Sequence, residues 1–259
     1  MNEPFPPLRI YPDRPSAAAA AADHAARIIK DAIAQRGEAR IIAATGASQI
    51  EFVEALVGTA GIDWSRVEMF HLDEYIGLSI EHPASFRRYL LERLIRPTGI
   101  TRYHLLDGES DPAETCATVG RDLQSGPIDV VFAGIGENGH VAFNDPPANF
   151  TAEAPYLIVE LDDACRRQQF SEGWFPTFDD VPRQAITLSV QQLLKTNAVI
   201  TLVPDTRKAA AAARCLEGPI SPDAPASILR QHPGNHFYFD EAGASELSDA
   251  FRAAHVLSS

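Results

Sequence analysis

The chain has 259 residues, 45% of them hydrophobic, and carries a formal net charge of −13 at pH 7. A chain of this length can bury a large core, and because no shift in composition divides it, we expect a single domain over residues 1–259. The acidic balance argues against nucleic acid as a partner, and the lack of a membrane-length apolar run or a signal-peptide pattern argues for a cytoplasmic protein without a membrane partner.

The first elements after a proline-rich lead-in are a helix, a strand and a second helix. Asp13 can cap a helix that runs from Ser16 to about Arg36, and Gly37 ends it. The apolar pattern then predicts a strand over residues 40–44 and a helix over residues 49–57.

The turn between this strand and the second helix consists of small residues, Thr45-Gly46-Ala47-Ser48. Unpaired N–H groups at the start of a helix point outwards and can bind an anion. Such a turn is also a common connector, so both interpretations stay open. The distinction matters because a net charge of −13 repels an anionic ligand, whose attraction must then come from local groups.

Two adjacent carboxylates, Asp73 and Glu74, follow the next expected strand at residues 66–70. Carboxylates at the carboxyl end of a buried strand are poorly placed for packing and well placed for acid–base work. The alternative is that one of them caps a turn. A further helix is expected to start at His82-Pro83, and a strand is expected over residues 103–106.

The most distinctive stretch is Gly134 to Pro147, GIGENGHVAFNDPP, which follows a buried strand at residues 128–133. Its glycines fit the GxGxxG pattern of dinucleotide sites, but that motif requires a helix to open at its last glycine, Gly139. The sequence Asn-Asp-Pro-Pro comes too soon for such a helix. We therefore interpret the stretch as a ligand-binding loop whose glycines permit tight turns and close approach of a substrate, with His140 presented to that substrate.

Strands and helices alternate again after this loop. The pattern predicts strands over residues 156–161, 198–203 and 235–240, and helices over 189–195 and 205–218 and from 241 onwards. Residues 162–180, which include Arg166 and Arg167, form either a wall of the site or a solvated loop. Arg207 and Lys208 oppose the dipole of their helix unless an anion lies between them and the helix end; two surface cations are the alternative.

This alternation predicts an α/β fold, a single-domain, doubly wound, mostly parallel sheet of Rossmann-like type with helices on both faces. The three cysteines, Cys116, Cys165 and Cys215, are far apart and include no CxxC pair. Neither a disulfide framework nor a zinc site is therefore expected, and we interpret them as buried thiols.

Three segments together resemble the glucosamine-6-phosphate deaminase family, whose members are relatives of 6-phosphogluconolactonase. They are FHLDEYIGL with HPASF after it, GIGENGHVAFNDP, and AITLSVQQLL leading to LVPDTRKAAA. The resemblance extends from about Ile41 to Leu247. It implies conversion of glucosamine 6-phosphate and water to fructose 6-phosphate and ammonium, without a metal or another cofactor.

The resemblance also assigns roles to residues. Asp73 corresponds to the base that moves a proton from carbon 2 to carbon 1 of the opened sugar, and His140 to the group that opens the pyranose ring. Thr45, Gly46, Ala47 and Ser48 together with Lys208 correspond to the phosphate site. Gly139 is expected to contact the substrate through its backbone.

Two departures from the family pattern affect the surroundings of His140. Asn138 stands where many members have Asp, so an amide replaces a charge that Glu137 could supply instead. Asp145 stands where the family usually has Glu, and the shorter side chain implies a looser or water-bridged contact with the imidazole. Asn138 and Asp145 are expected to orient His140.

Two further departures affect the phosphate site. The serine of the family's phosphate turn falls on Ala47, which leaves its N–H and the neighbouring Ser48. The family's phosphate arginine lies in a segment that does not align, so either Arg166 or Arg167 substitutes for it.

Two other functions remain open from the sequence. One is a 6-phosphogluconolactonase-type hydrolase, in which His140 would act as a general base on water. The other is a non-catalytic sugar-phosphate-sensing module, since similar folds serve different functions. The sequence leaves the sugar epimer and the oligomeric state open, with a homo-oligomer as one alternative.

Overall fold

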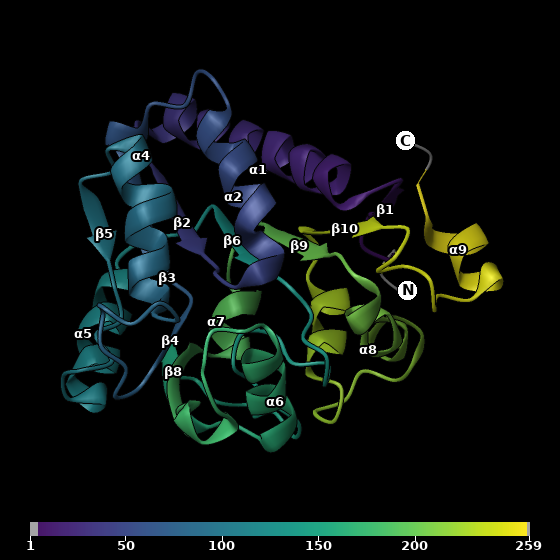
Figure 1. Cartoon of the computed structure of the whole chain (residues 1–259). Coiled ribbons are helices and arrows are strands. Elements are labelled where there is room, and N and C mark those ends of the chain that lie inside the picture. The colour runs from purple at the N-terminus through teal and green to yellow at the C-terminus, as the bar shows by residue number, and fades with distance from the viewer. Residues whose placement is uncertain (1–4, 258–259) are drawn as a thin grey trace.

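A seven-stranded parallel sheet forms the centre of the computed structural model, which describes residues 5–257 (Figure 1). The strand order is β1-β10-β9-β6-β2-β3-β5. From β2 the chain proceeds through β3 to β5, and it then returns to the other side of β2 for β6, β9 and β10, so the order reverses between β2 and β6. The bounds are β1 Leu8–Tyr11, β2 Ala39–Ala43, β3 Val67–His71, β5 Arg102–His104, β6 Val130–Ala133, β9 Val199–Val203 and β10 Asn235–Asp240.

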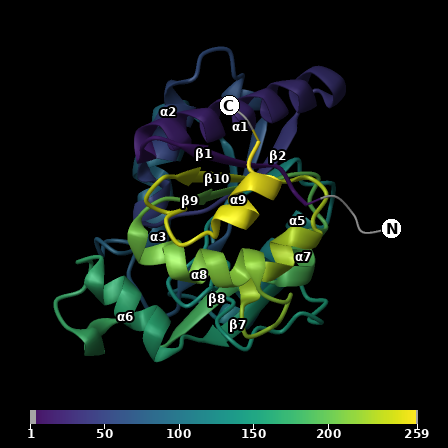
Figure 2. The ribbon, with the colours of Figure 1, turned by 90° about the vertical axis from the view of Figure 1, so that its right-hand side faces the viewer.

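Helices cover both faces of this sheet. α1 and α2 pack against each other on one face, while α7 and α8 lie on the opposite face (Figures 1 and 2). The predicted doubly wound, mostly parallel sheet with helices on both faces is confirmed. The helices are α1 Arg14–Arg36, α2 Ile50–Gly58, α3 Phe86–Leu90, which continues through a π-turn at Leu91–Ile95 into α4 Arg96–Thr98, α5 Pro112–Leu123, α6 Asp163–Ser171, α7 Val190–Leu194, α8 Thr206–Glu217 and α9 Asp249–His255.

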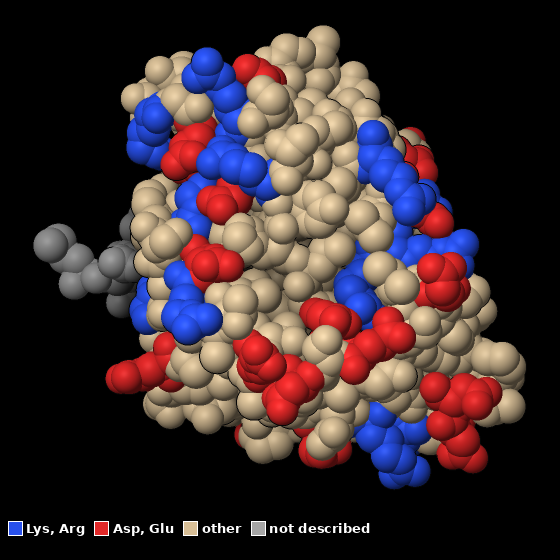
Figure 3. Space-filling view, turned by 90° about the vertical axis from the view of Figure 1, so that its left-hand side faces the viewer, with Lys and Arg blue, Asp and Glu red and all other residues tan. Residues whose placement is uncertain are grey.

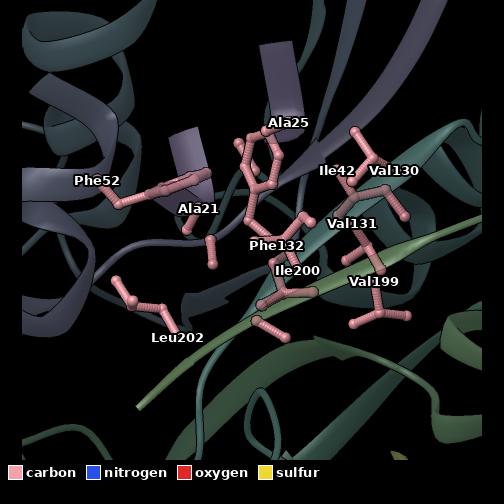
Figure 4. Close-up of a cluster of buried hydrophobic side chains, with 14 of the residues drawn as sticks. Ala21, Ala25, Ile42, Phe52, Val130, Val131, Phe132, Val199, Ile200 and Leu202 are labelled. Atoms are coloured by element: carbon pink, nitrogen blue, oxygen red, sulfur yellow. The ribbon is translucent and has the colours of Figure 1, made fainter. Parts of the chain in front are cut away.

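The longest helix, α1, has the ends that the sequence predicted. The side chain of Asp13 accepts a hydrogen bond from the N–H of Ser16, and Gly37 ends the helix at φ 85°, a left-handed conformation that glycine adopts without strain. The alanines of α1 form its buried side. Figure 4 shows Ala21 and Ala25 beside the aromatic rings of Phe52 and Phe132, and such small side chains let the helix lie close to the sheet.

A second sheet of three antiparallel strands was not predicted. Its order is β4-β8-β7, with bounds Asp73–Tyr75, Gln184–Leu188 and Tyr156–Glu160. Only β7 was expected as a strand. The N–H of Leu72 donates to Ala43 and its carbonyl accepts from Leu188, so the chain passes at this residue from the large sheet to the small one. β4 pairs with β8, which lies more than a hundred residues further along the chain. The pattern of residues within a short segment cannot predict such a pairing.

Several predicted boundaries were wrong. The helix expected at His82 begins at Phe86, because the Ser85 hydroxyl caps it. The terminal helix expected from Glu241 begins at Asp249, capped by Ser248. Residues 162–180 contain the helix α6, and the proline-rich lead-in contains β1.

The exterior carries charges of both signs. On the face shown in Figure 3 blue and red side chains are interspersed, without the continuous basic surface that a nucleic-acid backbone requires. Within residues 5–257 no helix combines the length and the apolar character needed to cross a bilayer.

Candidate active site

A cleft lies over the carboxyl ends of the central strands, at the point where the strand order reverses. Ligands bind at this position in open α/β sheets. Its walls come from the turn after β2, the segment that follows β3, the loop after β6, the start of α3, one side of α6 and the first turn of α8. The lining residues are Ala44, Thr45, Gly46, Ala47, Ser48, Gln49, Leu72, Asp73, Phe86, Gly134, Ile135, Gly136, His140, Ala142, Phe143, Gln168, Gln169, Glu172 and Lys208.

Asp73 is the buried carboxyl group of this cleft. Its side chain is only 6% exposed, and within residues 5–257 its carboxylate accepts no hydrogen bond. Burial raises the pKa of Asp73 to about 8, and the neighbouring Glu74 adds to the shift. A carboxyl group with a pKa near the operating pH exchanges protons readily, as acid–base catalysis requires.

Glu74 points away from the cleft and caps α3. Its carboxylate accepts hydrogen bonds from the N–H groups of Tyr75 at 2.9 Å, Phe86 at 3.2 Å and Arg87 at 2.7 Å, and from the Ser85 hydroxyl at 3.2 Å. Burial raises the pKa of Glu74 to about 7 against the opposite effect of these hydrogen bonds. Glu74 is therefore the carboxylate that caps a turn, and Asp73 stays the candidate for acid–base work.

His140 is held by a tight loop rather than by a helix. Its N–H donates to the side chain of Asn138 at 3.0 Å, and its carbonyl accepts from the N–H of Gly136 at 3.0 Å. A Cβ on Gly136 would lie 2.2 Å from Nε2 of His140, so only glycine allows the ring to lie against the backbone there. Gly139 has φ +90°, and no helix begins at this residue. A dinucleotide-binding motif needs such a helix, so the geometry agrees with the sequence argument against that motif.

Asp145 lies behind the imidazole and is itself held in place. Its Oδ1 lies 3.1 Å from Nδ1 of His140, although the ring N–H is not aligned with it for a hydrogen bond. Asn138 donates to Oδ1 at 2.9 Å, and the N–H of Asp162 donates to Oδ2 at 3.0 Å. Burial by itself raises the pKa of Asp145, but the contacts with His140, Asn138 and Asp162 outweigh it and hold the pKa below its usual range.

Glu137 does not join this group. Its carboxylate lies 3.8 Å from the guanidinium of Arg207, and its N–H donates to Gln168 at 2.8 Å. Asp145 is thus the carboxylate nearest to the imidazole nitrogen, and the expectation that Glu137 could supply a charge there gains no support.

The other end of the cleft can bind an anion. The turn Thr45–Ser48 leads into α2, and the hydroxyl of Thr45 is buried without a hydrogen-bond partner in the described part of the chain. Lys208 is 5% exposed, its ammonium has no acceptor within residues 5–257, and burial lowers its pKa. Arg207 instead lies at the surface, where it contacts Asp205 at 3.2 Å. One of the two expected cations is therefore in the cleft.

Neither arginine of α6 reaches the cleft. The Arg166 guanidinium donates to the carbonyls of Phe178 and Val181, both at 3.1 Å, and Arg167 is exposed outside the lining. Gly139 also does not line the cleft; it packs against Arg214 and Cys215 of α8.

Three residues that the sequence did not indicate line the cleft from α6 and its C-cap, namely Gln168 and Gln169 in the helix and Glu172 directly after it. Gln169 accepts a hydrogen bond from the Tyr75 hydroxyl at 2.7 Å, which leaves its amide NH₂ free to donate. Gln168 donates to Glu172 at 3.2 Å. Glutamines are ordinary helix-surface residues, so only a correct prediction of α6 and its orientation could have drawn attention to them.

The chain matches one family model over residues 12–238, that of glucosamine-6-phosphate isomerases/6-phosphogluconolactonase. It is 34% identical over 239 residues to a glucosamine-6-phosphate deaminase of Geobacillus sp. (strain WCH70), covering 90% of this chain and 94% of that protein. It is 32% identical over 247 residues to a glucosamine-6-phosphate deaminase of Rhodopirellula baltica, covering 93% of this chain and 95% of that protein.

Two solved structures extend the comparison. A monomeric glucosamine-6-phosphate deaminase has a TM-score of 0.85 at 28% identity, covering 93% of this chain and 99% of that chain. A 6-phosphogluconolactonase from Shewanella baltica has a TM-score of 0.76 at 19% identity, covering 93% of this chain and 99% of that chain. The second likeness shows a shared fold.

Proposed function

The chain belongs to the family of glucosamine-6-phosphate isomerases and 6-phosphogluconolactonases, and within it we propose a glucosamine-6-phosphate deaminase, which converts glucosamine 6-phosphate and water to fructose 6-phosphate and ammonium. The relatives named as deaminases are 32–34% identical over most of the chain. The observation that carries the chemistry is Asp73, a buried carboxyl group without a partner in the described chain, in the same cleft as His140.

His140 opens the sugar ring in this proposal. The carboxylate of Asp145 lies next to Nδ1 and favours a proton there, which leaves Nε2 to accept and return the proton of the ring-opening step. The amide of Asn138 and the N–H of Asp162 hold Asp145 in position. The amide at position 138 thus supports the carboxylate at 145 without adding a second charge.

Asp73 moves the proton between carbons. Its carboxylate removes the proton from carbon 2 of the open-chain aldehyde and returns one to carbon 1, which leaves an imine at carbon 2. Water adds to that imine, and ammonium leaves as the ketose forms. With a pKa of about 8, Asp73 is largely protonated at neutral pH in the free protein. The ammonium group of the substrate favours its ionised form, because an opposite charge close to a carboxyl group lowers its pKa.

The phosphate group binds at the turn Thr45–Ser48 and Lys208. N–H groups at the start of a helix and a buried ammonium are the local attraction that an acidic protein needs for an anionic ligand. The amide of Gln169 adds a neutral donor at the wall formed by α6. Arg166 and Arg167 have no place in this proposal, since neither lines the cleft.

The lactonase alternative makes a different demand on the site. Hydrolysis of a lactone needs a base for water and has no use for a group that carries a proton between two carbons. Purified protein should therefore release ammonium and fructose 6-phosphate in equal amounts from glucosamine 6-phosphate. Hydrolysis of 6-phosphogluconolactone without ammonium release from the amino sugar would overturn the assignment.

A further inference from the structure

A thiol, an imidazole and a carboxylate meet beside the cleft. One ligand atom from each of His140, Asp145 and Cys165 lies within 4.8 Å of those of the other two. His140 and Asp145 come from the loop after β6, and Cys165 comes from the first turn of α6. We propose that these three residues form an inhibitory site for a soft divalent cation of the zinc type.

The imidazole has a nitrogen available for such an ion. His140 is 7% exposed, and its Nδ1 forms no aligned hydrogen bond with any group of residues 5–257, although Asp145 lies 3.1 Å away. A buried polar atom without a partner destabilises the fold, so a ligand that satisfies it binds with a gain. Nδ1 faces the carboxylate, which places it among the proposed ligands.

The donor set suits zinc. Zn²⁺ binds imidazole, thiolate and carboxylate in a tetrahedron with bonds of about 2.0–2.3 Å, which implies about 3.3–3.8 Å between neighbouring ligand atoms. Ligand atoms within 4.8 Å of one another need side-chain shifts of about 1 Å to reach that geometry. A water molecule would complete the coordination.

The surroundings of Asp145 support the same conclusion. Its oxygens already accept hydrogen bonds from Asn138 and from the N–H of Asp162, so the carboxylate is oriented before an ion arrives. Hydrogen bonds of this kind to a ligating residue commonly strengthen metal binding.

Charge balance favours a divalent ion in this buried position. Cys165 is fully buried, and its thiol releases a proton to solvent when the sulfur binds the metal. A dication with one thiolate, one carboxylate and one neutral imidazole has no net charge. Burial of a neutral group of this kind avoids the large penalty of an unpaired charge.

Inhibition follows from the position of the site, because His140 is one of the proposed ligands. The inhibition therefore rests on the proposed function, whereas the binding of the metal does not. A metal on Nδ1 takes the place of the ring proton that Asp145 favours, so the neutral imidazole carries its proton on Nε2, which can then no longer accept the proton of the ring-opening step. The bound ion would thus stop turnover by occupying a catalytic side chain. It has no part in the reaction.

The test uses Co²⁺ as a spectroscopic probe and Zn²⁺ as the inhibitor, with purified full-length protein. Wild type should show one equivalent of Co²⁺ with a near-ultraviolet thiolate-to-cobalt band, and Zn²⁺ should abolish that band. The same band is expected for Cys116→Ser, which keeps all three ligands. It should be absent from Cys165→Ser and Cys165→Ala, two variants whose melting curves check the fold.

Activity provides the second measurement. Zn²⁺ should inhibit release of ammonium by wild type and by Cys116→Ser, and EDTA should restore it. The inhibition constant should rise at least about 100-fold in Cys165→Ser, since loss of a direct ligand exceeds the 10–100-fold effect of losing an outer hydrogen bond. An equal cobalt band in the Cys165 variants, or no band in wild type, would overturn the site. A band without any deamination would leave the site standing and refute the proposed function.

Discussion

Replacement of Asp73 by asparagine should inactivate the protein and at the same time stabilise it. The pKa of Asp73 is raised from 3.8 to about 8 in the fold. At pH values between these two, the unfolded chain has released a proton that the folded chain still holds, so the free energy of unfolding falls as the pH rises. Asparagine does not titrate and removes this loss.

The pKa shift sets an upper limit on the gain. A shift of about four units at about 1.4 kcal/mol each gives a ceiling of about 6 kcal/mol at pH 8. An amide that is left without partners in the same position costs about 1–3 kcal/mol. We therefore expect Asp73→Asn to raise the free energy of unfolding by at least about 1 kcal/mol at pH 8, with a smaller gain at pH 5.5.

Urea unfolding of wild type and variant at both pH values measures this difference, and ammonium release should fall about 10²–10⁴-fold. Glu74→Gln is the matched control. Its carboxyl pKa is also raised, to about 7, but its carboxylate accepts hydrogen bonds from three N–H groups, two of them in the first turn of α3. Glu74→Gln should therefore be destabilised at both pH values. An Asp73→Asn variant that is no more stable than wild type at pH 8 would show that Asp73 is not strained by burial.

Three further substitutions test the remaining parts of the site. His140→Gln should slow reaction of the closed pyranose more than reaction of an open-chain analogue, and equal losses on both would contradict a role limited to ring opening. Lys208→Ala should raise the Michaelis constant and the inhibition constant of inorganic phosphate by about 10- to 150-fold, the equivalent of about 1.5–3 kcal/mol, whereas Arg207→Ala, at the exposed neighbouring position, should change both little. Gly136→Ala should lower kcat strongly, because the added Cβ would lie 2.2 Å from Nε2 of His140. Gly58→Ala is the control and should leave kcat unchanged, because its added Cβ would have no atom within 4 Å. Similar values of kcat for the two variants would mean that the position of the imidazole is not critical.

The large sheet could be predicted from the sequence because its information is local. Apolar strands alternate with capped helices, and Asp13, Gly37 and Asp205 mark helix ends where the structure has them. The small sheet could not be predicted in the same way. β4 has three residues, and it exists because it pairs with β8 far along the chain.

Some residues of the candidate site could be predicted from the sequence, and others could not. Asp73, His140 and Lys208 were predicted from their residue types and from the resemblance, and the structure brings all three to one cleft. Arg166 and Arg167 were candidates only because they lie in the right segment. Which side of α6 faces the cleft depends on its packing.

The group formed by Cys165, His140 and Asp145 also could not be predicted from local sequence. Spacing in the sequence argued against a zinc site, because the three cysteines are far apart and include no CxxC pair, and Cys165 stands 25 residues from His140. The fold places the two side chains together with Asp145. Spacing rules detect sites built from one local segment, whereas this group joins a loop to a helix start.

The central claim is that Asp73 carries a proton from carbon 2 to carbon 1 during deamination. The most direct measurement follows glucosamine 6-phosphate deuterated at carbon 2 in ordinary water, with the product analysed by proton and deuterium NMR and ammonium assayed in parallel. The account predicts fructose 6-phosphate that carries deuterium from carbon 2 at a single stereochemical position of carbon 1, one equivalent of ammonium, and at least about 100-fold slower formation of both products by Asp73→Asn. Product without deuterium at carbon 1, deuterium distributed over both positions of carbon 1, or turnover by Asp73→Asn within threefold of wild type would contradict it.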